Sequence, residues 1–192
     1  MDNSEDLISA LQTIQVLFNT LQIRYFIGGS VASSYHGAMR STMDVDIVAD
    51  IELKHIPTIL ETVANEYYAS DIAMRNAVQR RSAFNLIHLP TSFKVDIFVS
   101  RGRRFDESAF SRATCCQLGT TENCVQVPIA SVEDILLAKL DWYRAGGEVS
   151  ERQWSDVSRI VKLNRNNMDW KYLESAAQDI LVSDLLDRVR ST

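Results

Sequence analysis

Asp44 and Asp46 stand one residue apart inside the apolar run MDVDIVA. Side chains two positions apart in a β-strand point to the same face, so both carboxylates are expected on one side and Val45 and Ile47 on the other. A carboxylate on a mostly buried strand is costly unless a cation neutralises it. These two aspartates therefore predict a nearby cation.

A second strand repeats this arrangement in the run FKVDIFV, residues 93–99. Its valines and isoleucine share one face, and Asp96 lies on the opposite face beside Lys94. Lys94 is expected to neutralise Asp96, and a role at a phosphate is the alternative. If this strand neighbours the strand of Asp46 with matched faces, three carboxylates converge on one cleft. Three carboxylates repel one another unless divalent cations lie among them, and ligation by oxygen alone favours Mg²⁺ or Mn²⁺ over zinc.

The glycine pair Gly28-Gly29, followed by Ser30, comes between an apolar run and a stretch of small residues. Such a strand-to-helix turn lets the backbone approach a phosphate closely and points N–H groups at it. Ser30 is expected to donate its hydroxyl and its backbone N–H to a triphosphate. The alternative role for Ser30 is that of a plain helix N-cap.

Phosphoryl or nucleotidyl transfer is the chemistry that needs this set of residues. Asp44 and Asp46 are expected to hold two metal ions and the triphosphate, and Asp96 to complete the metal that activates an acceptor hydroxyl. Two carboxylates acting as acid and base without a metal, as in glycoside hydrolysis, are the alternative. That alternative gives the glycine turn no role.

The same residues carry a resemblance to a known family, and the pattern runs through Gly28-Gly29-Ser30, His36-Gly37, Arg40, Thr42, Asp44, Asp46 and Asp96. It resembles the nucleotidyltransferase fold shared with DNA polymerase beta over residues 24–99. The similarity is to small bacterial members, including toxin-system nucleotidyltransferases, and more loosely to aminoglycoside nucleotidyltransferases. It implies Mg²⁺, a nucleoside triphosphate donor and transfer of a nucleoside monophosphate to an acceptor.

Supporting residues follow on either side of this pattern. Arg40 and Thr42 precede the strand of Asp44, where they are expected to reach the triphosphate or the acceptor, or else to lie in a solvated loop. Lys139 stands in an apolar helix, LLAKLDW. The resemblance implies that it reaches the nucleotide phosphates; the alternative is a surface lysine whose stem covers apolar area. Three tryptophans are expected to form the core of the C-terminal half, with base stacking as the alternative: Trp142, Trp154 and Trp170.

Hydrophobic spacing and caps predict the elements that must position these residues. Helices are expected over 5–21, 30–35, 54–66, 71–81, 106–113, 131–147, 150–164 and, as one helix or two, 169–190. Strands are expected over 24–27, 44–49, 83–89, 93–99 and 124–127, with 83–89 and 93–99 forming a hairpin. The predicted fold is α/β (α+β): a small mixed sheet flanked by helices over 1–104, with a mostly helical region over 105–192 packed on it.

Composition limits the class of protein. The formal net charge of −5 disfavours a dedicated non-specific nucleic-acid binder, although arginines in 75–81 and 101–104 slightly favour an anionic acceptor. No apolar run is long enough for a membrane helix, so no membrane association is expected. The polar N-terminus lacks the pattern of a secretory signal. Cys115, Cys116 and Cys124 are expected to be reduced thiols in a cytoplasmic protein.

These observations predict a metal-dependent nucleotidyltransferase that takes a nucleoside triphosphate, ATP among the candidates. The acceptor stays open between RNA, a protein hydroxyl and a small molecule, because all three need the same metal chemistry. The alternative is a catalytically silent nucleotide- or partner-binding module, such as a toxin–antitoxin component. A further alternative is a helical interaction protein whose aspartates are structural.

Overall fold

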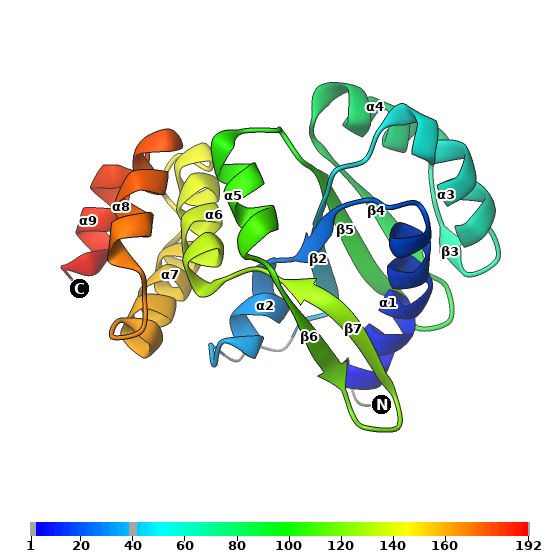
Figure 1. Ribbon diagram of the computed structural model, residues 1–192, viewed down its shortest axis with the longest axis horizontal. Helices are drawn as coiled ribbons and strands as arrows, with labels where there is room; N and C mark the ends of the chain where they lie inside the picture. The colour runs from blue at the N-terminus through cyan, green and yellow to red at the C-terminus, as the bar shows by residue number, and fades with distance from the viewer. Residues whose placement is uncertain (1–2, 39–41, 192) are drawn as a thin grey trace.

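The computed structural model describes residues 3–38 and 42–191, and these ranges form one mixed β-sheet with helices on both faces (Figure 1). The strand order in the described residues is β3-β4-β5-β2-β1-β7-β6. The strands are β1 (Tyr25–Ile27), β2 (Asp44–Ala49), β3 (Tyr67–Tyr68), β4 (Ala83–His88), β5 (Phe93–Val99), β6 (Thr114–Gly119) and β7 (Cys124–Ile129).

The centre of the sheet joins segments that are far apart in the sequence. Strand β2 pairs antiparallel with β1 and parallel with β5, and β1 pairs parallel with β7. The hairpin of β4 and β5 is antiparallel, as the sequence predicts. The side chains of Val45 and Ile47 on β2 and of Val95 and Ile97 on β5 are fully buried on one face of this sheet, which confirms their expected orientation.

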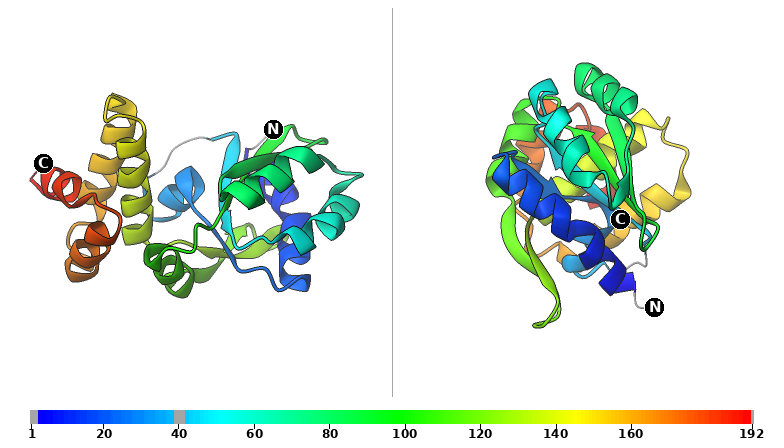
Figure 2. Two further views of the ribbon diagram at one scale, coloured as in Figure 1. Left: turned by 90° about the horizontal axis from the view of Figure 1, so that it is seen from above. Right: turned by 90° about the vertical axis from the view of Figure 1, so that its right-hand side faces the viewer.

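The helices lie on both sides of the sheet. They are α1 (Asn3–Thr20), α2 (Gly29–Tyr35), α3 (Ile56–Val63), α4 (Asp71–Arg80), α5 (Arg104–Arg112), α6 (Val132–Ala145), α7 (Glu151–Asn164), α8 (Trp170–Asp179) and α9 (Ser183–Arg190). Helix α1 contacts β5, β6, β7 and α3 and covers the apolar face. Helices α6 to α9 gather at the opposite end of the molecule, as Figures 1 and 2 show.

A buried ionic network fixes the C-terminal helices to one another. Arg112 of α5 contacts Glu133 at 2.8 Å and Asp134 at 3.4 Å, both on α6. Asp134 also accepts hydrogen bonds from the hydroxyls of Ser131, at 2.6 Å, and of Tyr172 on α8, at 2.5 Å. Buried carboxylates with several donors resist rearrangement, because breaking one contact leaves a charge without a partner. The network therefore sets the position of α6.

Several expected elements differ at their ends. Ser30 is not the N-cap that the sequence suggested, because α2 already begins at Gly29 with Gly28 as N-cap and has no side-chain cap. Helix α5 begins at Arg104 rather than at residue 106. Strands β3 and β6 were not predicted, since β3 has two residues and most β6 side chains are exposed, which removes the alternating pattern.

The expectation of a tryptophan core is wrong for Trp142, whose exposed fraction is 49%. Trp154 and Trp170 are partly buried against the core. The predicted boundary after residue 104 stays a prediction, and the sheet includes β6 and β7 from beyond it. None of the helices in the described part of the chain is long and apolar enough to cross a membrane.

Truncation of Ile97 tests the importance of the β2–β5 contact. This side chain is 0% exposed, so Ile97→Ala leaves a cavity and is expected to lower the free energy of unfolding by about 2–5 kcal/mol. The matched control is Ile72→Ala on α4, at a side chain that is 74% exposed, with an expected change below about 0.5 kcal/mol. Urea denaturation followed by circular dichroism compares the two; equal losses would contradict this account.

Candidate active site

The register of β2 and β5 places the three predicted carboxylates on one face of the sheet. Asp46 lies directly opposite Asp96, and Asp44 lies opposite Lys94. The aspartates are partly buried, while the residues between them are fully buried on the other face. Because paired residues on adjacent strands share a face, the matched-face arrangement expected from the sequence is confirmed.

A fourth polar side chain extends this line across the sheet. Asn85 on β4 pairs with Asp96, so Asp46, Asp96 and Asn85 form one row across three strands, here called the carboxylate row. Asn85 is exposed. The sequence analysis did not select it, although its place in the alternating β4 pattern is a usable signal once the strand register is known.

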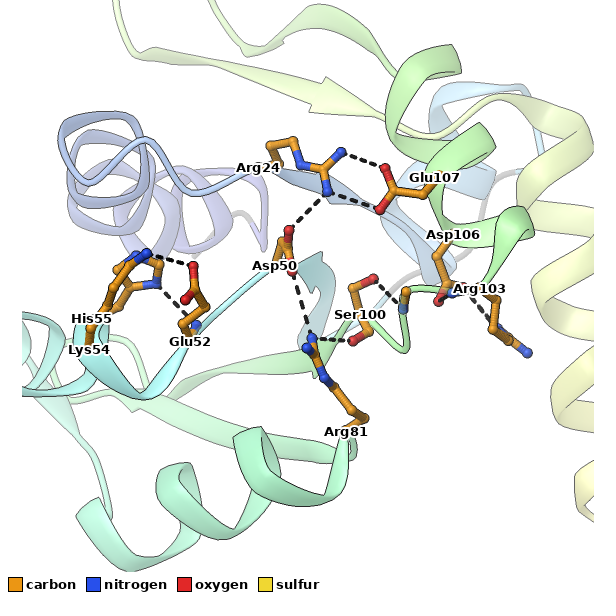
Figure 3. Close-up of polar contacts among 11 residues, drawn as sticks. Arg24, Asp50, Glu52, Lys54, His55, Arg81, Ser100, Arg103, Asp106 and Glu107 are labelled. Carbon is orange, nitrogen blue, oxygen red and sulfur yellow. Dashed lines mark hydrogen bonds and ion pairs between the residues drawn. The ribbon is translucent and has the colours of Figure 1, made fainter.

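Two more rows follow on the same face, toward the ends of β2 and β5. The next row is apolar and consists of Phe26, Val48, Phe98 and Ala83, paired in that order across four strands. Beyond it lies an ionic row, in which Arg24 contacts Asp50 at 2.9 Å and Arg81 contacts the same carboxylate at 3.7 Å (Figure 3). The face thus changes from carboxylates to apolar side chains to ion pairs.

The glycine turn packs directly against Asp46. Gly28 N–H donates to the backbone oxygen of Asp46 at 2.8 Å, and the backbone N–H of Ser30 donates to its carboxylate. Gly29 has φ +55, and a Cβ built there would lie 1.6 Å from Asp46 Oδ2. Only glycine leaves room for this carboxylate, so the turn and Asp46 form one structural unit.

Asp46 carries unbalanced negative charge. Burial, together with Asp44 and Asp96, raises its pKa to about 6, while Lys139 and the N–H of Ser30 act in the opposite direction. The neighbouring carboxylates are more fully compensated: Lys94 Nζ lies 2.7 Å from Asp96 Oδ2, as the sequence suggested, and the hydroxyl of Thr42 donates to Asp44.

The chemistry of this donor set suits a hard divalent cation, because all three side chains offer carboxylate oxygens and repel one another. Within residues 3–38 and 42–191, however, no three His, Cys, Asp or Glu side chains converge closely enough to enclose a metal ion. Lys94 supplies positive charge to Asp96 in this arrangement. Asp44 and Asp46 are therefore the candidate cation ligands on this face.

A cleft of about 430 Å³ opens over this face of the sheet. The sheet contributes Asp46 and Phe98, helix α2 contributes Gly29, and helix α6 contributes Lys139 and Trp142. Such a volume lies within the range of small-molecule sites, about 300–1,000 Å³. Of the three predicted carboxylates, Asp46 lines the cleft, whereas Asp44 and Asp96 are not part of its lining. The cleft thus brings Asp46 and the C-terminal helices together.

Lys139 faces the cleft rather than open solvent. Its side chain is 20% exposed, and its Nζ lies 3.8 Å from Asp156 Oδ2 on α7. Both residues also line a small hollow beside the cleft, together with Ser30 and Arg159. Arg159 is a basic residue that the sequence analysis did not select. Arg40 lies outside the described residues.

The comparisons with known proteins agree with this architecture. No protein family model and no curated protein sequence matches the chain. A crystal structure of an antigenic nucleotidyltransferase-like protein from Paracoccidioides brasiliensis is similar, with a TM-score of 0.54 and 17% identity over 98% of this chain and 93% of that chain. The solution structure of the antibiotic-resistance factor ANT(2″)-Ia gives a TM-score of 0.52 and 13% identity over 97% and 93%.

A crystal structure of ANT(2″)-Ia in complex with adenylyl-2″-tobramycin is also similar, with a TM-score of 0.53 and 11% identity over 91% of this chain and 97% of that chain. At these identities the likeness is one of fold. The chain shares its fold with the nucleotidyltransferase-like protein and with ANT(2″)-Ia, so the fold that the sequence resemblance implied is confirmed.

Gly29→Ala tests the packing of the turn against Asp46. A Cβ at this position overlaps the carboxylate, so the substitution is expected to displace Asp46 and to abolish the metal-dependent nucleotide binding that we propose for this site. Gly147→Ala is the matched control, since its φ is +76 and nothing lies within 4 Å of an added Cβ. The control is expected to lose about 1–2 kcal/mol through backbone strain and to keep full binding. Nucleotide titration calorimetry that gives equal affinities for both variants would contradict the packing argument.

Asp46→Asn tests the charge imbalance through stability. A carboxyl group whose pKa rises from 3.8 to about 6 on folding prefers the protonated folded state, so the free energy of unfolding falls as pH rises from about 4 to 6 and then levels. Without metal, Asp46→Asn is expected to flatten this dependence and to be more stable than the wild type at pH 8, by about 1–3 kcal/mol.

Urea denaturation in EDTA at several pH values measures this difference. Asp71→Asn, at an exposed carboxylate on α4, serves as the control and is expected to retain the wild-type pH dependence. An Asp46→Asn variant that also retains that dependence would show that Asp46 is not the group responsible.

Proposed function

We propose that this protein transfers a nucleoside monophosphate from a nucleoside triphosphate to an acceptor hydroxyl, with Mg²⁺ or Mn²⁺ as cofactor. The observation that carries the proposal is the register of β2 and β5. It sets Asp46 opposite Asp96, with Asp44 on the same face, and Asp46 itself packs on the glycine turn and lines a ligand-sized cleft. No purely structural role requires three carboxylates to share a face beside an open cleft.

In this proposal Asp44 and Asp46 hold the divalent ions, and Asp96 directs the acceptor hydroxyl and receives its proton. A bound divalent ion supplies the positive charge that an in-line transfer requires at the phosphates and at the attacking oxygen. Lys94 releases Asp96 when that carboxylate takes up its role. The carboxylate of Asp46 is held in place beforehand by the Gly28-Gly29-Ser30 turn.

The phosphates of the donor are assigned to the side of the cleft where α2 meets α6. Lys139 and Ser30 line the same hollow there, and Arg159 adds a second basic side chain. Gly28 and Gly29 line the adjoining cleft and let the donor approach the backbone. Thr42 orients Asp44 through its hydroxyl, and Arg40 is proposed to reach the triphosphate from the segment before β2.

The fold supports an adenylyl or related donor and a small acceptor. One protein of the same fold was crystallised with an adenylylated aminoglycoside, adenylyl-2″-tobramycin. ATP is therefore the first donor to test, and a small-molecule hydroxyl is the first acceptor class. A cytoplasmic location remains part of this proposal, with Cys115, Cys116 and Cys124 as reduced thiols.

One observation favours a second candidate, a nucleotide- or partner-binding module without turnover, such as a toxin–antitoxin component. The ion pair between Lys94 and Asp96 compensates the third carboxylate without any metal. A protein that uses this pair permanently would bind a nucleotide through Asp44 and Asp46 and would release no pyrophosphate.

The proposed function is tested by incubating the purified protein with each α-labelled nucleoside triphosphate, Mg²⁺ or Mn²⁺, and separated RNA, protein and small-molecule fractions. Label is expected in one fraction, with release of pyrophosphate, and Asp46→Ala is expected to reduce the rate by at least about a hundredfold because it removes a metal ligand. Asp71→Ala, at an exposed carboxylate of α4, is the control and should keep the full rate.

A folded Asp46→Ala protein with full activity would refute this mechanism. Metal-dependent nucleotide binding without pyrophosphate release in any fraction would favour the binding module instead. In that case Lys94→Ala, which frees Asp96, separates a blocked enzyme from a module that lacks turnover altogether.

A further inference from the structure

We propose that the acceptor is a small molecule with a flat apolar ring near its hydroxyl and an anionic group on the far side of that ring. The ring packs on Phe98 and Trp142, and Arg101 binds the anionic group. This inference rests on the proposed function and specifies its unknown substrate.

An aromatic wall stands in the cleft next to the carboxylate row. Phe98 of the apolar row and Trp142 of α6 meet edge to face, with ring centroids 5.6 Å apart and planes at 69°. Both line the cleft together with Val48, and Trp142 remains 49% exposed. Exposed aromatic faces inside a cleft lose water favourably to a flat apolar ligand, and edge-to-face pairs leave such faces available.

The position of this wall favours the acceptor over the nucleobase. Phe98 follows Asp96 by two residues on β5, so both side chains project from the same face of one strand. Helix α2, with Ser30, contacts β2 on the other side of Asp46. In-line transfer places the attacking oxygen opposite the departing pyrophosphate. If pyrophosphate leaves on the α2 side, the acceptor lies on the β5 side, against Phe98.

The charges at the far end of the wall single out Arg101. Three arginines of the described chain line this end of the cleft. Arg81 donates to the backbone oxygen of Ser100 and contacts Asp50, and Arg103 contacts Asp106 at 3.0 Å (Figure 3). Arg103 also contacts Asp141 at 2.8 Å.

Arg101 is exposed and has no hydrogen bond or ion pair with any residue of the described ranges. The guanidinium of Arg101 is thus available to a carboxylate or phosphate of a ligand. The two nearby carboxylates, Asp106 and Asp141, are occupied by Arg103, which leaves this end poorly suited to a polycationic acceptor.

The size of the cleft and the charge of the chain favour a small molecule over an RNA end. A volume of about 430 Å³ accommodates a ligand of modest size. The net charge of −5 disfavours an RNA backbone as a ligand. At this end of the cleft Arg81 and Arg103 already contact carboxylates, so Arg101 is left to bind a single anionic group.

The transfer balances without any further reactant. The acceptor hydroxyl oxygen forms a bond to the α-phosphorus, the bond from that phosphorus to the bridging oxygen of pyrophosphate breaks, and pyrophosphate leaves with the bonding electrons. The hydroxyl proton passes to Asp96 and then to water. The product is a phosphodiester between the acceptor and the nucleoside.

The experiment measures label transfer from α-labelled ATP with Mg²⁺ to a matched set of acceptors. The set contains hydroxymethylbenzoate and hydroxyphenylacetate, their neutral amides, tobramycin and a short RNA with a free 3′ hydroxyl. Transfer to the ring acids is expected, with weaker transfer to the amides. Arg101→Ala is expected to raise KM about tenfold for the acids and to leave the amides unchanged, a difference of about 1.4 kcal/mol. Arg104→Ala, an exposed arginine outside the cleft lining, is the control.

Trp142→Ala separates the acceptor from the nucleobase. It is expected to raise KM for acids and amides alike while the Kd for ATP stays unchanged. If Trp142→Ala weakens the binding of ATP but leaves the binding of tripolyphosphate intact, the nucleobase packs on this aromatic wall. That result would overturn the inference.

The outcome with the wild-type protein distinguishes the two proposals. In one outcome, the protein binds ATP in a metal-dependent way that Asp46→Ala abolishes, but label appears on RNA or tobramycin, or on none of the ring acids. This outcome overturns the acceptor inference and leaves the proposed function standing. Absence of any metal-dependent binding of a nucleoside triphosphate overturns the proposed function, and this inference with it.

Discussion

The close approach of Gly29 to Asp46 is the constraint on which the rest of the site depends. The carboxylate occupies the space where any other residue would carry a Cβ, and it accepts the N–H of Ser30. It is thereby held on the sheet face beside Asp44 and Asp96, where burial and like charge raise its pKa. The rest of the fold must offset the unfavourable electrostatic free energy of this carboxylate. A cation bound at such a site neutralises the charge and thereby stabilises the folded state.

The sheet face is divided into rows with different chemistry because its strands are in strict register. The carboxylate row, the apolar row and the ionic row lie at successive two-residue steps along β2 and β5. The proposed chemistry, the proposed ring contact and the ion pairs that brace the far edge therefore occupy separate parts of one surface. A one-residue slip of β5 would move Asp96 and Phe98 to the opposite face together and would break the first two rows.

The C-terminal helices complete this surface rather than merely covering it. The network of Arg112, Glu133, Asp134 and Tyr172 holds α5, α6 and α8 together, and α6 carries both Lys139 and Trp142 into the cleft. The fold is shared with a nucleotidyltransferase-like protein and with ANT(2″)-Ia at 17% identity or less, and a shared fold at such identity does not imply a shared substrate. Specificity is thus expected to reside in residues that vary while the fold is kept.

Local periodicity was sufficient to place the carboxylates of one strand on one face, because a strand alternates with a period of two. Asp44, Asp46 and Asp96, the glycine turn and the caps at Ser131 and Ser150 all follow from patterns a few residues long. Only the tertiary structure revealed that Asn85 joins the carboxylate row and that Trp142 faces the cleft.

The tertiary structure also distinguished Arg101 from Arg103. The two arginines are alike in sequence, but carboxylates contact only Arg103 within the described residues. Pairing between strands, burial of a helix face and the partners of a charged side chain depend on segments far apart in the chain. The sequence by itself therefore determined the chemistry that this protein has available, and tertiary packing decided which side chains meet to use it.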